Sequence, residues 1–377
     1  MSSSCPRRLL MPSAEKIESL QVGRGVAALL VVLVHVTTFI HLNYKEVFAA
    51  NSFIAGSAGV DFFFVLSGFI IWHRHARDIG HPERAISYGW RRFVRIYPAY
   101  WIVTLAILPA YFLVPKYGQG DETTPYVIST SLLLLPATRS PLLVAGWTLI
   151  HELWFYLLFA GLIAVRGSLF RWVVGVWGCG VAAFVIGVGD TRSLVHPWLR
   201  TIFQPVNFEF IFGCLAAWIV TRGNHQSARA WLGLLAAGLV AFAWCFFARP
   251  LGFEFRAGRV MTFGFSSFLI VLGAAGWELS TRRRPAAAFA GLPSALVFLG
   301  DASYALYLLH GPVLSLTCKV AAATGLLRSL GTAVVGWLAV VVCVLAACAF
   351  HQWLEKPLLR WLRRGGSGSR ETAPTTA

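Results

Sequence analysis

The feature that most constrains the fold is a series of long apolar runs. The first reads LQVGRGVAALLVVLVHVTTFIHL, residues 20 to 42, and others follow along the chain. About 20 apolar residues in a helix cross the roughly 30 Å of a bilayer's hydrocarbon. Only 13% of the 377 residues are charged, against about 25% in soluble domains. The runs predict a polytopic membrane protein, and the first is too long for a cleaved signal peptide.

Eleven apolar runs are candidates for membrane segments. They lie near residues 22–42, 54–72, 96–114, 126–136, 149–165, 172–188, 202–220, 230–248, 260–277, 295–316 and 330–350. The fourth has only eleven residues and ends in Pro136, so it suits a re-entrant or interfacial piece. We therefore expect an all-α integral membrane protein with about ten transmembrane helices and one short re-entrant segment near 126–136.

The basic residues predict the orientation, because cytoplasmic loops carry an excess of Lys and Arg. With ten crossings and a cytoplasmic N-terminus, 22 of the 32 basic residues lie on the cytoplasmic side. This bias explains the net charge of +16 without a nucleic-acid partner. We expect one membrane domain over 1–360 and a flexible cytoplasmic tail over 361–377. The seven cysteines show no metal-like spacing, and we expect no metal site.

Ionisable residues inside spans are costly and usually mark function, although pairing within the bundle is the alternative. Arg24 and His35 are eleven residues apart, which is three helical turns plus about 20°, so they share a face. The rise of roughly 16 Å places His35 near the middle of the bilayer. A lone buried histidine is often only a core residue, but its alignment with an arginine favours a functional role.

Two later runs carry further candidates. Asp61 lies near the outer end of the 54–72 run, with Ser67 at mid-depth. Asp61 is explained equally well as an acid that stabilises its own helix N-terminus. Glu152 is expected near the outer end of the 149–165 run, close to Trp147. A buried glutamate there could act as a base or orient a hydroxyl group.

Arg92 and Arg95 are three residues apart, so they share a helical face where the 96–114 run begins. Positive-inside anchoring explains any arginine at this place. A pair of forked donors near a helix N-terminus is also a good phosphate site. Late in the chain, Ser303 and His310 are seven residues apart and share a face, with Tyr304 beside them.

Together these segments resemble the membrane acyltransferase 3 family, the bacterial O-acetyltransferases of O-antigen and exopolysaccharides. The likeness covers about residues 17 to 360. It rests on Arg24-x10-His35, GVDFFFVLSGFI, Arg92-x-x-Arg95 before Tyr97-Pro98, WTLIHELWFY, EFIFGCLAAW, SYALYLLH and Glu355-Lys-Pro, in that order. Two departures are small: Thr148 stands where serine is usual, and His151 where an apolar residue is common.

The resemblance implies an enzyme that moves an acyl group, expected to be acetyl, from cytosolic acyl-CoA to a hydroxyl of a surface or lipid-linked glycan. The glycan would be an exopolysaccharide or lipopolysaccharide, and the enzyme would lie in the bacterial inner membrane. Acyl-CoA is a co-substrate, no resident cofactor is expected, and membrane lipids are the remaining partners. The competing class is a membrane transporter, which would show inverted repeats; none is visible in the sequence.

The resemblance also suggests roles for the candidate residues. His35 would be the catalytic centre, either as nucleophile or as general base. The implied catalytic set is His35, Arg24, Asp61 and Glu152, the donor-binding pair is Arg92 and Arg95, and the acceptor or supporting residues are Ser67, Trp147, Ser303, Tyr304 and His310.

Overall fold

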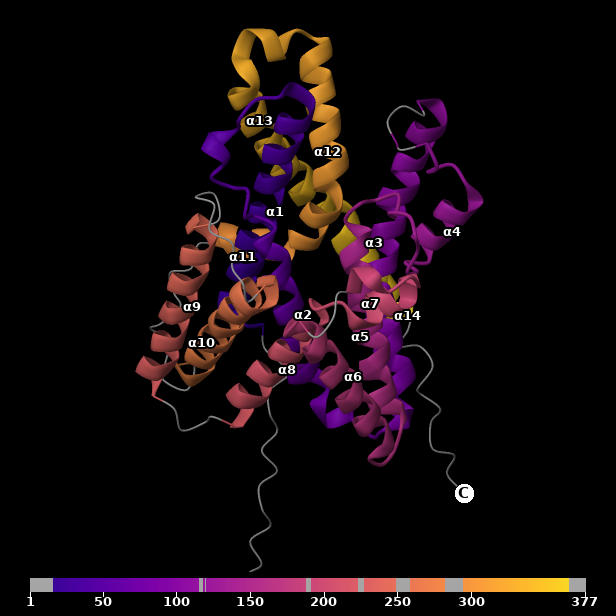
Figure 1. The fold of residues 1–377 in the computed structure, drawn as a ribbon, viewed down its shortest axis with the longest axis vertical. Coiled ribbons are helices and arrows are strands. Elements are labelled where there is room, and N and C mark those ends of the chain that lie inside the picture. The colour runs from indigo at the N-terminus through magenta and orange to yellow at the C-terminus, as the bar shows by residue number, and fades with distance from the viewer. Residues whose placement is uncertain are drawn as a thin grey trace, which may run out of the picture.

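The computed structural model describes residues 16–114, 118, 120–187, 191–222, 227–248, 258–281 and 294–365, and no β-strand occurs in these ranges. The α-helices are α1 (Glu18–Tyr44), α2 (Ala58–His75), α3 (Ala85–Leu113), α4 (Pro125–Leu132), α5 (Gly146–Ala164), α6 (Leu169–Val185), α7 (Pro197–Phe203), α8 (Asn207–Arg222), α9 (Ala228–Ala248), α10 (Phe265–Thr281), α11 (Ser294–Asp301), α12 (Ser303–Ala323), α13 (Leu326–Phe350) and α14 (Lys356–Gly365). Two π-helical turns, η7 (Val260–Gly264) and η8 (His351–Glu355), precede α10 and α14. The predicted all-α fold is confirmed (Figure 1).

Eight helical segments of the described chain are long and apolar enough to cross a membrane. They contain α1, α3, α5, α8, α9, α10, α12 and α13. Two more of the predicted crossings correspond to α2, whose ends are charged, and to α6, which has 17 residues. α2 packs against α1, α8 and α10. Its polar residues therefore lie inside the bundle, where a membrane protein can pair them.

The short segment predicted near 126–136 is α4 and the turn that follows it. Eight residues of helix span about 12 Å, too little to cross the bilayer. Leu132 and Leu133 present their carbonyl oxygens to Trp101 and Tyr97 of α3, at 2.8 and 3.0 Å. Tyr97 lies about 18 Å from the first residue of α3, so the segment returns to the middle of that helix. Side-chain donors satisfy its free carbonyl groups, as a non-helical backbone at membrane depth requires.

The predicted span 295–316 is wrong in its bounds. The structure divides it at Ala302 into the short α11 and the membrane-length α12, which continues to Ala323. α11 packs across α1, where Gly25 and Gly300 bring the two backbones together. The apolar character of the run gave no sign of this break. At the other end of the chain, α14 continues past the predicted domain boundary at 360, while residues 366–377 of the predicted tail lie outside the described residues.

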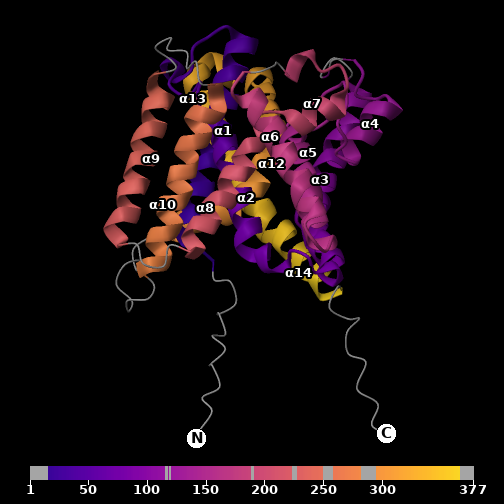
Figure 2. The same cartoon turned by 60° about the horizontal axis from the view of Figure 1, so that its bottom comes forward.

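The loops alternate between two ends of the bundle as consecutive crossings require. At one end, the carboxylate of Glu278 on α10 accepts hydrogen bonds from the first backbone N–H groups of α1, at 2.9 and 2.8 Å. Such a carboxylate suits the positive end of the helix dipole. Gly80, before α3, donates to the Leu162 carbonyl near the end of α5. Figure 2 shows α14 and the first turn of α1 at this same end.

A close helix crossing joins α2 to α8 through two glycines. A Cβ atom on Gly213 would meet the Val65 carbonyl oxygen and the backbone of Gly68, and one on Gly68 would meet the Phe210 backbone. Small residues allow helices in membranes to approach this closely. The crossing fixes the position of the central helix α2, which also carries Asp61 and Ser67.

We therefore expect Gly213→Ala to lower the melting temperature of the purified protein. Overpacking of a tight interior typically costs about 1–3 kcal/mol, which exceeds the gain of up to about 1 kcal/mol from replacing glycine by alanine in a helix. Gly233→Ala on α9 is the matched control, because no atom lies within 4 Å of its added Cβ. Equal melting temperatures for the two variants would contradict this account of the crossing.

Candidate functional site

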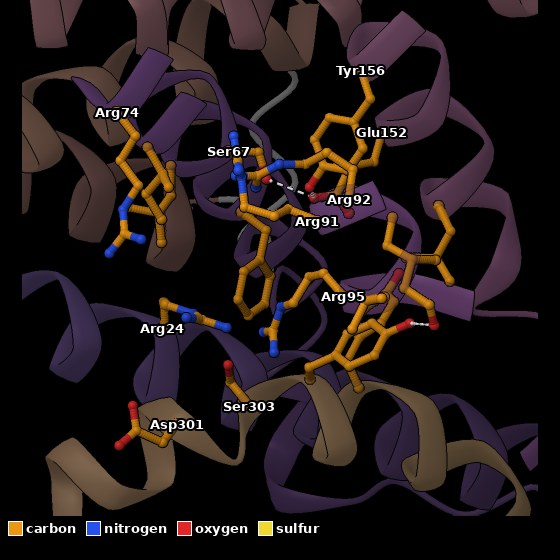
Figure 3. Close-up of a pocket in the computed structure, with 18 of the residues that line it drawn as sticks. Arg24, Ser67, Arg74, Arg91, Arg92, Arg95, Glu152, Tyr156, Asp301 and Ser303 are labelled. Carbon is orange, nitrogen blue, oxygen red and sulfur yellow. Dashed lines mark hydrogen bonds between the residues drawn. The ribbon is translucent and has the colours of Figure 1, made fainter. Parts of the chain in front are cut away.

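A cavity of about 1190 Å³ reaches into the bundle from the end where α14 and the loop before α3 lie. Its walls come from α1, α2, α3, α5, α11, α12, η8 and α14 and from the loop before α3. Small-molecule sites usually have about 300–1,000 Å³, so this cavity has room for a large ligand. Figure 3 shows several of its polar side chains directed toward the same space.

The cavity is strongly basic. The basic residues that line it are Arg24, Arg74, Arg91, Arg92, Arg95, Lys356 and Arg363, and the acidic ones are Glu83, Glu152 and Asp301. Asp301 is already paired with Lys16 at 2.6 Å. Walls with so large an excess of one charge concentrate ligands of the opposite sign. The cavity therefore favours an anionic ligand.

Arg95 is held from two directions. Its Nη1 donates to Glu355 at 3.1 Å, and its guanidinium lies 5.0 Å from the centre of the Tyr304 ring. Glu355 is 1% exposed and also interacts with His351 Nδ1 at 2.7 Å. A buried carboxylate with several partners fixes the direction of the guanidinium. The π-helical turn η8, which contains both His351 and Glu355, thus orients a side chain of α3.

Arg92 is held through a histidine at the end of α2. Its Nη2 donates to His75 Nε2 at 3.2 Å, and its guanidinium lies 5.4 Å from the centre of the Tyr156 ring. Because Nε2 accepts, Nδ1 of His75 carries the proton and donates to Asp78 at 2.7 Å. Burial opposes ionisation of Asp78, but hydrogen bonds, chiefly from His75, outweigh it and hold the pKa of this carboxyl below its usual value.

Arg24 has a neutral partner, the side-chain oxygen of Gln21 at 3.3 Å. Its guanidinium and that of Arg95 turn toward one another across the cavity (Figure 3). Two like charges that face each other repel, and an anion between them removes the repulsion. Guanidinium groups match the oxygens of phosphate with paired hydrogen bonds. The predicted phosphate-binding pair, Arg92 and Arg95, thus lines one cavity together with Arg24.

Glu152 of α5 also lies in this cavity rather than in an aromatic belt at the outer end. Its Oε1 accepts a hydrogen bond from Ser67 Oγ of α2 at 3.1 Å and another from the Tyr156 hydroxyl one turn later. Two donors on one oxygen fix the orientation of this carboxyl group. Six residues into α5, about 9 Å along the helix, this group lies where a ligand could meet it.

Ser303 and Tyr304 begin α12 and line the same cavity. The Ser303 hydroxyl is buried, and no hydrogen-bond partner for it occurs in the described chain. The Tyr304 hydroxyl donates to the Ile96 carbonyl of α3 at 2.8 Å. Tyr304 therefore joins α12 to α3 beneath Arg95, and Ser303 has a free hydroxyl beside the arginines.

His35 and His310 form a separate pair, with ring centres 4.6 Å apart. His35 Nδ1 lies 2.7 Å from the Val31 carbonyl, and His310 Nδ1 lies 2.7 Å from the Tyr307 carbonyl. A carbonyl oxygen can only accept, so each Nδ1 carries the proton and each Nε2 keeps its lone pair. Both rings are therefore held in the form that can take up a proton or attack a carbonyl carbon.

An aromatic partition, formed by Phe63 and Tyr307, lies between this pair and the arginines. Both rings line the cavity, with centres 6.1 Å apart, and Tyr307 is in turn 5.8 Å from His310. The Tyr307 hydroxyl shares a 2.7 Å hydrogen bond with the Thr148 hydroxyl. His35 is not among the residues that line the cavity. Arg24 and His35, expected to act on one helical face, thus lie on opposite sides of the partition.

Asp61 and Trp147 lie outside the cavity. Asp61 is 0% exposed and accepts from Arg259 Nε at 2.7 Å. Trp147 is 40% exposed, and its ring centre lies 6.0 Å from that of His151. Within the described residues, no group of three His, Cys, Asp or Glu side chains is placed to hold a metal ion.

Several polar residues of the site were not predicted from the sequence as site residues. Arg74 and Arg91 were counted only as topological charges, and Tyr156 follows Glu152 by one helical turn, a spacing that would have indicated their contact. Glu355 was assigned only to the end of the last span. Arg259 gave no signal, because its partner Asp61 is 198 residues away in the sequence.

Comparison with known proteins identifies the family. The acyltransferase domain family matches residues 17–351. The exopolysaccharide production protein ExoZ of Rhizobium meliloti is 33% identical over 319 residues, which cover 82% of this chain and 92% of the relative. The acyltransferase MdmB of Streptomyces mycarofaciens is 28% identical over 388 residues, 94% of each chain. Protein 2 in the picA locus of Rhizobium radiobacter is 31% identical over 170 residues, 41% of this chain and 78% of the relative.

No solved structure gives a significant match to this chain. The family match nevertheless extends over nearly all of the helical bundle, from the start of α1 to the first residue of η8. It includes the arginine-lined cavity except for Lys356 and Arg363, and it includes the aromatic partition and the histidine pair. The predicted family is confirmed: the chain belongs to the acyltransferase 3 family of membrane proteins and is an acyltransferase that transfers groups other than aminoacyl groups.

Proposed function

We propose that the enzyme takes an acetyl group from cytosolic acetyl-CoA and transfers it to a hydroxyl of a surface or lipid-linked glycan. The observation that carries this proposal is the two-sided site. A basic cavity opens at one end of the bundle, and a histidine pair with free Nε2 atoms lies beyond the aromatic partition. The similarity to ExoZ, an exopolysaccharide production protein, supports a glycan as the acceptor.

The basic cavity suits the donor. Coenzyme A carries several phosphate groups, and the facing guanidinium groups of Arg24 and Arg95, with Arg92 beside them, offer forked donors for them. With the phosphates among these arginines, the thioester would point toward the partition. Because the cavity opens where α14 and the arginine-rich loop lie, the positive-inside bias supports a cytoplasmic position for its mouth.

His35 is the proposed centre of the transfer. Its Nε2 lone pair could remove the proton from an acceptor hydroxyl, whose oxygen then attacks the acyl carbon; the carbon–sulfur bond breaks, and coenzyme A leaves as a thiolate that takes the proton from the imidazolium. The same lone pair could instead attack the acyl carbon first; the carbon–sulfur bond then breaks, coenzyme A leaves as the thiolate, and the resulting acyl-imidazole passes the acyl group to the acceptor hydroxyl oxygen. The hydrogen bond of Nδ1 to Val31 serves both routes. Glu152, held by Ser67 and Tyr156, would orient groups on the donor side.

The first test concerns the donor. We expect the double change Arg92→Ala with Arg95→Ala to weaken acetyl-CoA binding by at least about tenfold, since one hydrogen bond to a charged group contributes about 1.5–3 kcal/mol. Binding is measured by calorimetry on the purified protein. Lysine at both positions should rescue poorly, because an ammonium group lacks the fork.

The matched control is Arg171→Ala, since Arg171 is exposed on α6 and does not line the cavity. Removing Arg95 alone would leave the buried Glu355 carboxylate without its guanidinium. The variants at Arg95 are therefore also made together with Glu355→Gln. The melting temperature of every variant is recorded. Donor affinity equal to that of the parent, in a folded double variant, would reduce the pair to topological anchors.

The second test concerns His35. His35→Ala should lower glycan acetylation by about 10²–10⁴-fold, the usual contribution of a general base, while the melting temperature changes little. Its described polar contact is to a carbonyl of its own helix, so little packing is lost. His41→Ala, at the exposed end of α1, is the control and should keep activity. Parent-level acetylation by the His35→Ala variant would remove the centre of the proposal.

The two routes through His35 separate in one further measurement. Purified protein is mixed with labelled acetyl-CoA in the absence of any glycan. A histidine nucleophile gives transient label on the protein that His35→Ala abolishes, whereas a general base gives no label. We expect no label, because an acyl-imidazole at membrane depth would need protection from hydrolysis.

The third test concerns orientation in the bacterial inner membrane, for which we propose that both termini are cytoplasmic. A reporter inserted at Gly167, between α5 and α6, should report a cytoplasmic position, and one at Gly120 an external position. The comparison depends on α4, because a crossing by that segment would place Gly120 and Gly167 on the same side of the membrane. An external signal at Gly167 would contradict the assignment.

A further inference from the structure

A second charged cluster lies between α2, α8 and the π-helical turn η7, away from the arginine-lined cavity. It contains Asp61 of α2, Glu209 of α8 and Arg259, which precedes η7. Both carboxyl side chains are 0% exposed. Neither the donor site nor the histidine pair uses this cluster.

The hydrogen bonds of Arg259 are directed to one of the two acids. Its Nε lies 2.7 and 2.9 Å from the two carboxylate oxygens of Asp61, and its Nη2 reaches Asp61 at 2.5 Å and the Ser57 carbonyl at 2.6 Å. This is a charge-assisted pair with several hydrogen bonds. Asp61 therefore has the contacts of an ionised carboxylate.

Glu209 has no such contacts. Neither of its carboxyl oxygens has a hydrogen-bond partner among the described residues, although the group is fully buried. It lies beside the Asp61 carboxyl, and Gly264 of η7 packs against its other side, so that a Cβ there would come within 2.9 Å of Oε1. Two ionised carboxylates can only accept hydrogen bonds. Their contact therefore needs a donor that the described part of the chain does not supply.

Charge balance leads to the same requirement. Among the residues that the structure describes here, two carboxylates and one guanidinium leave one uncompensated negative charge inside the helix bundle, which is strongly unfavourable. Adjacent carboxyl groups avoid this by sharing one proton, because both cannot ionise together. We propose that the Asp61–Glu209 pair is a proton-binding site, in which Glu209 carries the proton and donates it to Asp61, while Arg259 keeps Asp61 ionised.

The surrounding elements offer few groups that could donate a hydrogen bond to Glu209, or compensate its charge, in place of this proton. On α5, His151 interacts through Nδ1 with the side-chain oxygen of Asn207 at 3.1 Å, at the start of α8. On α12, Tyr307 faces Arg259 and shares its hydroxyl with Thr148. On α6, Arg171 lies near the helix start, whereas α10 presents Ser266 and Ser267 in its first turn, with its only described acid, Glu278, near its far end.

Loss of the proton would place a net negative charge near the α2–α8 crossing. The two backbones are already in close contact there, at Gly68 and Gly213. α2 also carries Phe63 of the aromatic partition and Ser67 of the cavity. The proton therefore stabilises the helix that separates the two sides of the site. This inference stands on the buried cluster and does not depend on the identity of donor or acceptor.

The test uses the full chain in lipid nanodiscs and infrared difference spectroscopy, which distinguishes a protonated carboxyl from a carboxylate. We expect the parent at neutral pH to show a protonated carboxyl band that Glu209→Gln removes. Asp61→Asn should remove it too, because Glu209 would then ionise beside Arg259. Bands that persist unchanged in Glu209→Gln would overturn the proposal.

Thermal stability provides the second readout. Glutamine is the neutral, equally large counterpart of a protonated glutamate, so Glu209→Gln should melt within about 3 °C of the parent, whereas Glu209→Ala, which leaves a cavity, should melt clearly lower. Failure of Glu209→Gln to fold, or a loss equal to that of Glu209→Ala, would contradict a neutral Glu209. A band that appears only when sodium is removed would show a sodium site instead and would also overturn the proposal.

Discussion

The pair formed by Arg95 and Glu355 is the interaction on which the donor side of the structure depends. Arginine is costly inside a bundle of membrane helices unless a partner compensates its charge. Glu355, buried and bonded to His351, supplies that partner from the far end of the chain. The contact joins α3 to η8, closes the wall of the cavity and leaves the face of the guanidinium that points toward Arg24 available to an anion.

The aromatic partition gives the molecule two sides. In the proposed reaction, an acyl group leaves a water-soluble donor and reaches an acceptor on the other side of the membrane without being lost to water. Phe63 and Tyr307 separate the basic cavity from His310 and His35, yet the ring contacts from Phe63 to His35 are continuous. If the donor binds as proposed, the partition would keep its thioester among the arginines and leave only a short path to the histidine pair.

Much of the fold could be predicted because hydrocarbon imposes a simple rule on composition: each of the ten long apolar runs overlaps one long helix, and the short fourth run corresponds to α4 and the turn after it. The break at Ala302 could not, because it depends on the packing of Gly300 against α1. The arginines of the site were visible as charges in a regular spacing. Their partners were not, since Glu355 and Arg259 meet Arg95 and Asp61 across hundreds of residues. The separation of Arg24 from His35 likewise comes from α2 and α12, not from α1.

The central claim is that the donor lies among the arginines with its thioester at the aromatic partition. A structure determined by electron cryo-microscopy with a non-hydrolysable acetyl-CoA analogue tests it most directly. The account predicts phosphate density against Arg24, Arg92 and Arg95, and the acyl end of the analogue against Phe63 and Tyr307, on the side opposite His310. An analogue bound elsewhere, or one with its phosphates on the His35 side of the partition, would contradict it.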